Sequence, residues 1–210
     1  MSKRKIIIGS ISLILLLLSC NTGNNDGINT KKEEKSDIPN NSDAKYHFNL
    51  GMQYHTGSDE FDIDKRKAYD LFYKSAELGN ADAQYNLGVM HYFGEETPID
   101  KKRALYWYEK SAEKGNENAQ FNLALMYANG EETPIDKKKA LYWFEKSAEQ
   151  GQPMAQLNAG IMYMTADGVK YDEEKAEYWI LTAKDNEIER ANEVWNNFIK
   201  LKELKQKLKD

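Results

Sequence analysis

The side chains able to perform chemistry are few and scattered in this sequence of 210 residues. Its three histidines, His47, His55 and His91, form no pair at metal-ligand spacing that cysteines or carboxylates complete on one helix face. No glycine-rich phosphate loop and no nucleophile motif is present. The sequence therefore predicts a protein that is not an enzyme, with no catalytic residues, no metal and no cofactor.

Two repeated groups of side chains are better explained by structure than by ligands. Trp107, Trp143 and Trp179 recur every 36 residues, a spacing that favours packing between equivalent helices over an aromatic ligand track. The basic runs 101–103 and 137–139 each follow an aspartate that we expect to cap a helix, so they indicate solvated helix faces. With a net charge of −5, the chain is also not expected to bind nucleic acid.

The only cysteine, Cys20, ends an N-terminal segment with the features of an export signal. Three basic residues at 3–5 precede an apolar run at 6–18, which is too short for an ordinary membrane-spanning helix. The segment resembles a bacterial lipoprotein signal, which implies that Cys20 is lipidated, with palmitate among its acyl chains, and becomes the mature N-terminus. A plain secretory peptide with an incidental cysteine is the alternative. A lipoprotein signal predicts cleavage after residue 19 and a lipid-anchored protein of the bacterial cell envelope, facing the periplasm or the exterior.

Residues 20–43 follow this signal as the lipidated N-terminus and a tether. The segment has two isolated isoleucines, no aromatic residue and many Asn, Lys, Glu, Gly and Ser. It cannot bury enough apolar surface to offset the entropy of ordering. We expect a flexible spacer between the lipid and a folded domain.

The rest of the chain is built on an internal period. Residues 94–115 recur at 130–151 with 19 of 22 positions identical. These two segments lie 36 residues apart, and small residues at 51, 88, 124 and 160 recur at nearly the same period. A fixed period of this length is the signature of stacked repeats. We count four, at about 44–79, 80–115, 116–151 and 152–187, followed by a capping segment at 188–210.

Each repeat has the pattern of two helices. In the second repeat Asn80 is placed to cap a helix through residue 93, and Asp100 to cap another that runs to about residue 114. Gly115 is placed to end that helix in a left-handed conformation, and Pro153 falls in a first helical turn. Small residues mark close approaches of helices, and large aromatic residues fill the gaps between them.

Two motifs now support a resemblance to a known family. The first helices carry residues 83–88 (AQYNLG), with copies at 119–124 and 155–160, and the second helices end in the motif KALYWFEKSAEQG at 139–151. The sequence resembles the Sel-like repeat (SLR) family, a relative of tetratricopeptide repeats. The resemblance implies an all-α fold, a right-handed α/α solenoid of four helix pairs plus a C-terminal capping helix. Among the departures, His91 stands where the other repeats have Tyr54, Tyr127 and Tyr163.

The terminal segment continues the pattern of the repeats with an amphipathic helix. Val194, Trp195, Phe198 and the leucines 201, 204 and 208 make one apolar stripe, while most lysines lie outside it. A solenoid needs an end helix with one polar face, which predicts a cap. The alternative is that the basic face touches anionic lipid or a partner.

A row of asparagines on the first helices is the candidate binding site. In solenoids of this kind the first helices line the concave face, and an asparagine amide can bond an extended peptide through both its donor and its acceptor. The alternative is that these asparagines hold the junctions between repeats. The candidate residues are Asn49, Asp82, Asn86, Val89, Tyr92, Asn118, Asn122, Leu125, Met154, Asn158 and Ile161.

These observations predict a membrane-anchored scaffold that binds a protein or peptide partner on its concave face. A cell-wall or glycan-binding module using exposed aromatic side chains is the second hypothesis. A third is a β-lactamase-like enzyme, since some SLR proteins that carry a disulfide in each repeat are described that way. The repeats here contain no cysteine and no Ser-x-x-Lys nucleophile in a catalytic context, which argues against that enzyme.

Overall fold

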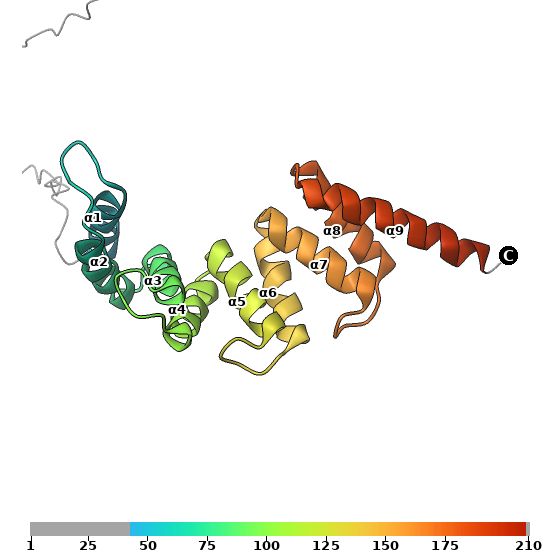
Figure 1. Cartoon of the computed structure of the whole chain (residues 1–210), viewed down its shortest axis with the longest axis horizontal. Coiled ribbons are helices and arrows are strands. Elements are labelled where there is room, and N and C mark those ends of the chain that lie inside the picture. The colour runs from blue at the N-terminus through green and yellow to red at the C-terminus, as the bar shows by residue number, and fades with distance from the viewer. Residues whose placement is uncertain (1–42, 209–210) are drawn as a thin grey trace, which may run out of the picture. The chain divides into compact units, whose positions relative to one another are not determined.

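A computed structural model describes residues 43–208 of the chain (Figure 1), and within that range all regular structure is helical. The all-α prediction is therefore confirmed. The helices in chain order are α1 (Ala44–Thr56), α2 (Lys65–Glu77), α3 (Ala81–Phe93), α4 (Lys101–Glu113), α5 (Glu117–Asn129), α6 (Lys137–Glu149), α7 (Pro153–Thr165), α8 (Glu173–Asp185) and α9 (Glu189–Lys207). The expected signal segment and most of the expected tether, residues 1–42, lie outside the described residues.

Side-chain caps set where helices α1 to α8 begin. Asp100 accepts a hydrogen bond from the Arg103 amide at 3.0 Å, and Asn80 accepts one from the Ala83 amide at 2.8 Å, as predicted. Each satisfies an amide that a first helical turn leaves without a partner. Gly115 follows α4 with φ +94°, the left-handed conformation expected from the sequence. The same position in the fourth repeat is Glu187, which adopts φ +60° without the freedom of a glycine.

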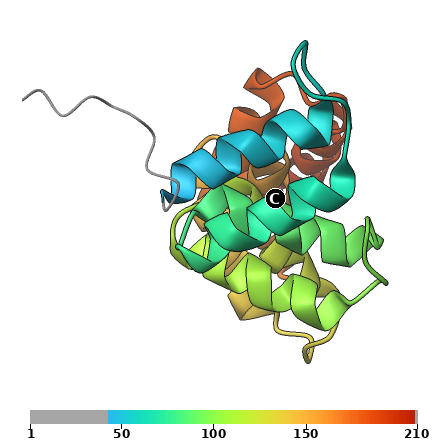
Figure 2. The same cartoon turned by 90° about the vertical axis from the view of Figure 1, so that its left-hand side faces the viewer.

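The helices pack as consecutive pairs that form an α/α solenoid. Each first helix lies against the second helix of its own repeat, and that second helix lies against the first helix of the next repeat. Figure 2 shows the leading pair, α1 and α2, side by side and joined by the loop of residues 57–64. The pairs α3/α4, α5/α6 and α7/α8 follow in the same way.

The row of small residues permits close approach within each pair. A Cβ atom built on Gly88 would lie 2.5 Å from two ring carbons of Tyr108, and one on Gly160 would lie 2.7 Å from Ile180. Ala124 holds the same position in the third repeat and is fully buried. Tyr108 is itself 1% exposed, so the aromatic ring fills the space that the glycine leaves. The predicted roles of the small and aromatic rows are confirmed.

Buried polar side chains join successive helices at the same period. The Ser111 hydroxyl donates to the Ala81 carbonyl at 2.7 Å, and the Gln120 amide donates to the Ala112 carbonyl at 3.1 Å. Equivalent serine and glutamine bonds recur in the neighbouring repeats. Trp107 and Trp179 are buried, so the tryptophan ladder is packing, as the sequence predicts.

Helix α9 covers the end of the last repeat over part of its length. Ala191 and Phe198 are fully buried, and Lys202 forms ion pairs with Glu173 and Glu177 of α8. Leu204 and Leu208 are 58% and 86% exposed, so the apolar stripe predicted from the sequence is only partly covered. The reason is geometric, because α9 is 19 residues long and α8 is only 13, so Leu204 and Leu208 lie beyond the part of α9 that α8 covers.

The helices belong to one compact unit that spans residues 38–210. The three hydrophobic clusters found among residues 43–208 lie in this unit, and a unit with a core of its own is expected to fold by itself. Among residues 43–208, no helix combines the length and the apolar character needed to cross a membrane.

Candidate functional site: a cavity between the first helices

Four of the predicted binding residues meet at one cavity between α3 and α5. Val89 and Tyr92 come from α3, and Asn122 and Leu125 from α5. The two helices contact each other directly, although they belong to different repeats. The cavity has a volume of about 490 Å³. We call its lining the α3–α5 groove, which also includes Tyr85, Phe93, Tyr108, Met126, Asn129 and Glu131.

The walls of the α3–α5 groove are largely aromatic and aliphatic. Phe93 is 69% exposed, and its ring meets the Tyr92 ring at 5.0 Å between centroids and an angle of 72°. The rings of Tyr85 and Tyr108, which also line the groove, have centroids 6.1 Å apart. An exposed phenylalanine beside half-buried apolar side chains marks surface that gains free energy when a ligand covers it.

Polar groups at the rim are held in fixed positions. The Glu131 carboxylate accepts hydrogen bonds from the Tyr92 hydroxyl at 2.9 Å and from Lys101 Nζ at 2.7 Å. Lys101, aided by Tyr92, holds the pKa of Glu131 below its ordinary value, so the carboxylate is ionised at neutral pH. The Asn122 amide bonds the Tyr108 hydroxyl, and burial raises the pKa of that tyrosine. The rim therefore offers oriented donors and acceptors beside an apolar floor.

The asparagine row is not uniform in its contacts. Asn86 donates to the Met52 sulfur at 3.7 Å, and Asn122 bonds Tyr108, so both contact the preceding repeat. Asn49 is exposed on α1, and Asn158 is half-buried on α7. Two of the four asparagines thus hold junctions between repeats, which was the alternative to a binding role. Only Asn122 also lines the groove.

The remaining predicted residues lie elsewhere. Asp82 and Asn118 are exposed at the first turns of α3 and α5, and Asp82 accepts a hydrogen bond from the Asn116 amide at 2.8 Å. Met154 and Ile161 lie on α7, where Ile161 packs beside Leu157. None of these four, nor Asn49, Asn86 or Asn158, lines the groove. Their role in binding stays a prediction.

Phe93 and Glu131 are not among the binding residues predicted from the sequence. A signal for Phe93 existed, since the same position in the other repeats holds Thr56, Asn129 and Thr165. Glu131 belongs to a loop, and its place at the groove depends on the packing of α5 beside α3.

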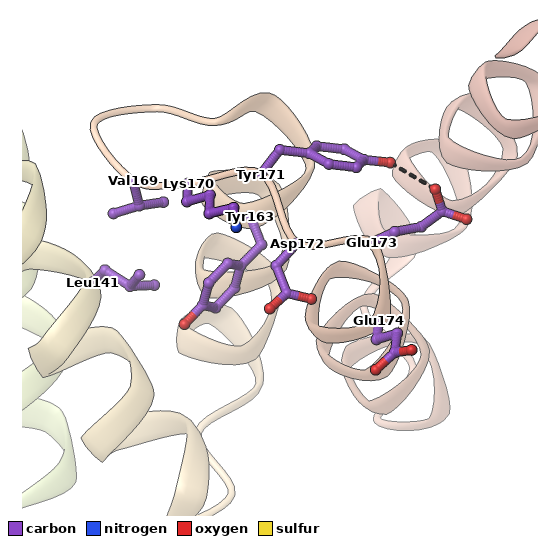
Figure 3. A pocket seen from close by; sticks show the side chains of 8 residues that line it. All are labelled: Leu141, Tyr163, Val169, Lys170, Tyr171, Asp172, Glu173 and Glu174. Atoms are coloured by element: carbon purple, nitrogen blue, oxygen red, sulfur yellow. Dashed lines mark hydrogen bonds between the residues drawn. The ribbon is translucent and has the colours of Figure 1, made fainter.

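A second hollow of about 490 Å³ lies at the loop between α7 and α8 (Figure 3). Figure 3 shows the Tyr171 hydroxyl bonded to the Glu173 carboxylate, a hydrogen bond of 2.9 Å. Tyr171, together with Lys202 of α9, keeps the pKa of Glu173 below its ordinary value. Asp172 caps α8 through the Lys175 amide. Glu173 therefore joins the fourth repeat to α9, whereas Asp172 serves as a helix cap.

The histidines have structural surroundings. His47 and His91 are buried, and His55 lies 3.5 Å from the Glu95 carboxylate. The His91 ring lies between the Tyr69 and Thr97 hydroxyls, each at 3.3 Å, and burial lowers its pKa. In the described part of the chain, no three His, Cys, Asp or Glu side chains gather as a metal-binding group.

Comparisons with known proteins agree with the repeat architecture. A family model described as Sel1 repeat matches residues 44–80, 81–116, 118–152 and 153–186. Among solved structures, the chain is similar to a protective antigen of uropathogenic Escherichia coli that displays an SLR fold. That alignment has 37% identity and a TM-score of 0.65, and it covers 69% of this chain and 31% of the antigen.

A Sel1 repeat protein from Oxalobacter formigenes is also similar, with 30% identity and a TM-score of 0.65. The alignment covers 70% of this chain and 60% of that protein. This chain therefore spans less than two thirds of either relative. No curated protein matches the sequence.

Proposed function

From the premise that the chain belongs to the Sel1-repeat family, we propose that it is a scaffold that binds a protein or peptide partner in the α3–α5 groove. Proteins built from Sel1 repeats are commonly protein-interaction modules and generally non-enzymatic. The observation that carries the proposal is the groove itself, where Val89, Tyr92, Asn122 and Leu125 surround one cavity beside the exposed Phe93.

The chemistry of the groove fits a peptide with bulky apolar side chains. A cavity of about 490 Å³ falls in the range of small-ligand sites, and its walls offer Phe93, Val89 and Leu125 to an apolar anchor. Asn129, exposed at the end of α5, supplies an amide with both a donor and an acceptor for a peptide backbone. Because the groove is formed by packed helices, little ordering is needed on binding.

Selection of peptides tests this proposal. A phage-displayed peptide library is panned on residues 38–210, and the affinities of selected peptides are measured for wild type and for Phe93→Asn. Asn occupies this position in the third repeat as Asn129, so the variant keeps a residue type that the fold accepts. We expect at least a tenfold loss, about 1.4 kcal/mol of binding free energy, because the largest exposed apolar side chain of the groove is removed.

Tyr178→Asn is the matched control, since Tyr178 is an aromatic side chain with 60% exposure on α8, away from the groove. We expect that variant to bind the peptides as wild type does. Equal losses in both variants, or none in Phe93→Asn, would contradict binding in the α3–α5 groove.

We further propose that the protein is exported and held at a membrane of the bacterial envelope by lipid on Cys20. The support is the sequence alone, in which the basic start, the apolar run and Cys20 occur in the order of a lipoprotein signal. Two or more acyl chains hold a protein stably, whereas one holds it only marginally. Metabolic labelling with a palmitate analogue tests this, and we expect incorporation into wild type but not into Cys20→Ser. Equal labelling of both proteins would contradict it.

A further inference from the structure

The first junction between repeats differs from the later ones at three positions that lie together. At the later junctions the Tyr127 hydroxyl donates to Glu109 at 3.0 Å, and the Tyr163 hydroxyl donates to Glu145 at 2.7 Å. At the first junction these two positions are His91 and Tyr73.

Tyr69 is the third difference, since the later repeats have Leu105 and Leu141 there. The Tyr69 hydroxyl and His91 Nε2 lie 3.3 Å apart, so the two substitutions form one unit. At the first junction, an aromatic surface thus replaces the tyrosine–glutamate hydrogen bond of the later junctions.

The altered junction opens a hollow on the second helices α2 and α4. It has a volume of about 230 Å³, and the rings of Tyr69, Tyr73, Tyr106 and Trp107 line it. Tyr73 and Trp107 meet edge to face, with centroids 6.0 Å apart and planes at 83°. Tyr73 is 45% exposed and Tyr106 is 48% exposed, so their rings are open to a ligand.

A second hollow, of about 390 Å³, adjoins the first, because Tyr69 and Tyr73 line both. Its other lining residues are Asp70 and Lys74. The rings of Tyr69 and Tyr73 are stacked, with centroids 6.5 Å apart and planes at 26°. Two compartments therefore share one aromatic wall.

Each compartment carries one acidic and one basic side chain at its edge. Glu77 and Arg103 belong to the first compartment, and Asp70 and Lys74 to the second. His91 adds no charge at neutral pH, since burial lowers its pKa. Asp70 also lies 4.0 Å from Arg66, and Arg103 lies 3.4 Å from Asp100, at exposed positions where such pairs are weak. This balance of charge favours a neutral ligand rich in hydrogen-bonding groups.

We propose that the two hollows form a binding site for a neutral oligosaccharide, with one sugar ring in each compartment. The C–H face of a pyranose ring packs on an aromatic ring, while its hydroxyl groups bond carboxylate, ammonium and guanidinium groups at the edge. A purely apolar ligand would desolvate those charged groups and offer them no new hydrogen bonds. The site lies on α2 and α4, whereas the proposed peptide groove lies between α3 and α5, so it is a separate function.

The most informative variant carries, at the first junction, the residues that the later repeats have there. Tyr69→Leu/Tyr73→Glu/His91→Tyr recreates the combination found as Leu105, Glu109 and Tyr127, which the fold already accommodates. Residues 38–210 of wild type and variant are titrated with chitotetraose, cellotetraose and maltotetraose, and binding is followed by NMR of the amide and indole N–H groups. We expect at least one of these probes to bind wild type with a Kd of about 1 mM or tighter, and the triple variant to bind it at least tenfold more weakly.

A second pair of variants keeps the test independent of how the triple variant folds. Tyr106→Ala removes an exposed ring from the site, and Tyr142→Ala removes the ring at the same position of the next repeat, which is 52% exposed. We expect weaker saccharide binding for the first and unchanged binding for the second. The proposal is overturned if none of the three tetrasaccharides binds wild type at about 10 mM. It is equally overturned if Tyr106→Ala and Tyr142→Ala bind the probe as wild type does.

Discussion

Replacing Gly88 by alanine sets two effects against each other. Alanine is the better helix former by about 1 kcal/mol, so propensity alone predicts that Gly88→Ala stabilises α3. Packing predicts the opposite, because the new Cβ would lie 2.5 Å from two carbons of the Tyr108 ring. Tyr108 is 1% exposed, so either its packed ring or the two helices α3 and α4 must shift to admit the new methyl group.

The sizes of these two effects decide whether Gly88→Ala stabilises or destabilises the protein. Overpacking in a core costs about 1–3 kcal/mol, and subtracting the gain of about 1 kcal/mol in helix propensity leaves a net loss of up to about 2 kcal/mol. For a domain of this size each kcal/mol shifts Tm by about 2–4 °C. Thermal unfolding of residues 38–210, followed by circular dichroism, measures this loss. The third repeat carries Ala124 at this position, so the variant is expected to fold despite the loss.

A double variant of Gly88 and its neighbour Tyr108 provides the control. Tyr108→Leu alone leaves a cavity, but combined with Gly88→Ala it gives the new methyl group room. The double variant should therefore be more stable than the sum of the two single losses predicts. A Gly88→Ala protein as stable as wild type, or more stable, would refute the claim that the glycine row exists for close packing.

Three further predictions rest on other features. Glu187→Gly should stabilise the protein by about 0.5–1 kcal/mol in urea unfolding, because Glu187 has φ +60° where the other repeats have glycine; a loss would contradict the strain argument. The folded-state pKa of Glu131 is lowered, so its contribution to stability is present above its unfolded pKa of about 4.3 and is lost as the pH falls. The urea midpoint of Glu131→Gln should accordingly fall less steeply than that of wild type below about pH 5, and parallel curves would contradict this. The purified protein should hydrolyse nitrocefin no faster than buffer does, and turnover well above buffer would contradict the prediction that the chain is not an enzyme.

The helical architecture was predictable because its signals are local and repeated. Asn80, Asp100 and Gly115 mark helix ends by the hydrogen bonds and backbone angles that only a few residue types supply. The recurrence of these signals every 36 residues made each repeat a check on the others. Pairing of neighbouring helices then follows from short connections.

The candidate sites were predictable only in part. The sequence predicted that equivalent faces of the first helices form a binding surface. Four residues of these faces, Val89, Tyr92, Asn122 and Leu125, do line one cavity. The sequence could not show that Asn86 bonds Met52, since that contact depends on how closely α3 approaches α1. Likewise, His91 was recognised as a departure from the repeat, but its coupling to Tyr69 crosses two helices and appears only in three dimensions.

The end helix shows the limit of pattern reading. The leucines at 201, 204 and 208 have the spacing of a buried stripe, yet Leu208 is 86% exposed. Periodicity reveals which side chains share a face, but the length of the neighbouring helix decides how many of them are covered. Here α8 ends before the stripe does.

Photo-crosslinking in cells would detect a protein partner bound in the α3–α5 groove. A photoreactive phenylalanine replaces Phe93 in one strain and Tyr178 in another, both exposed aromatic positions. We predict a discrete crosslinked protein at position 93 that is absent at position 178 and is reduced by an excess of a selected groove-binding peptide. The same crosslinked species at both positions, or none at position 93, would contradict it.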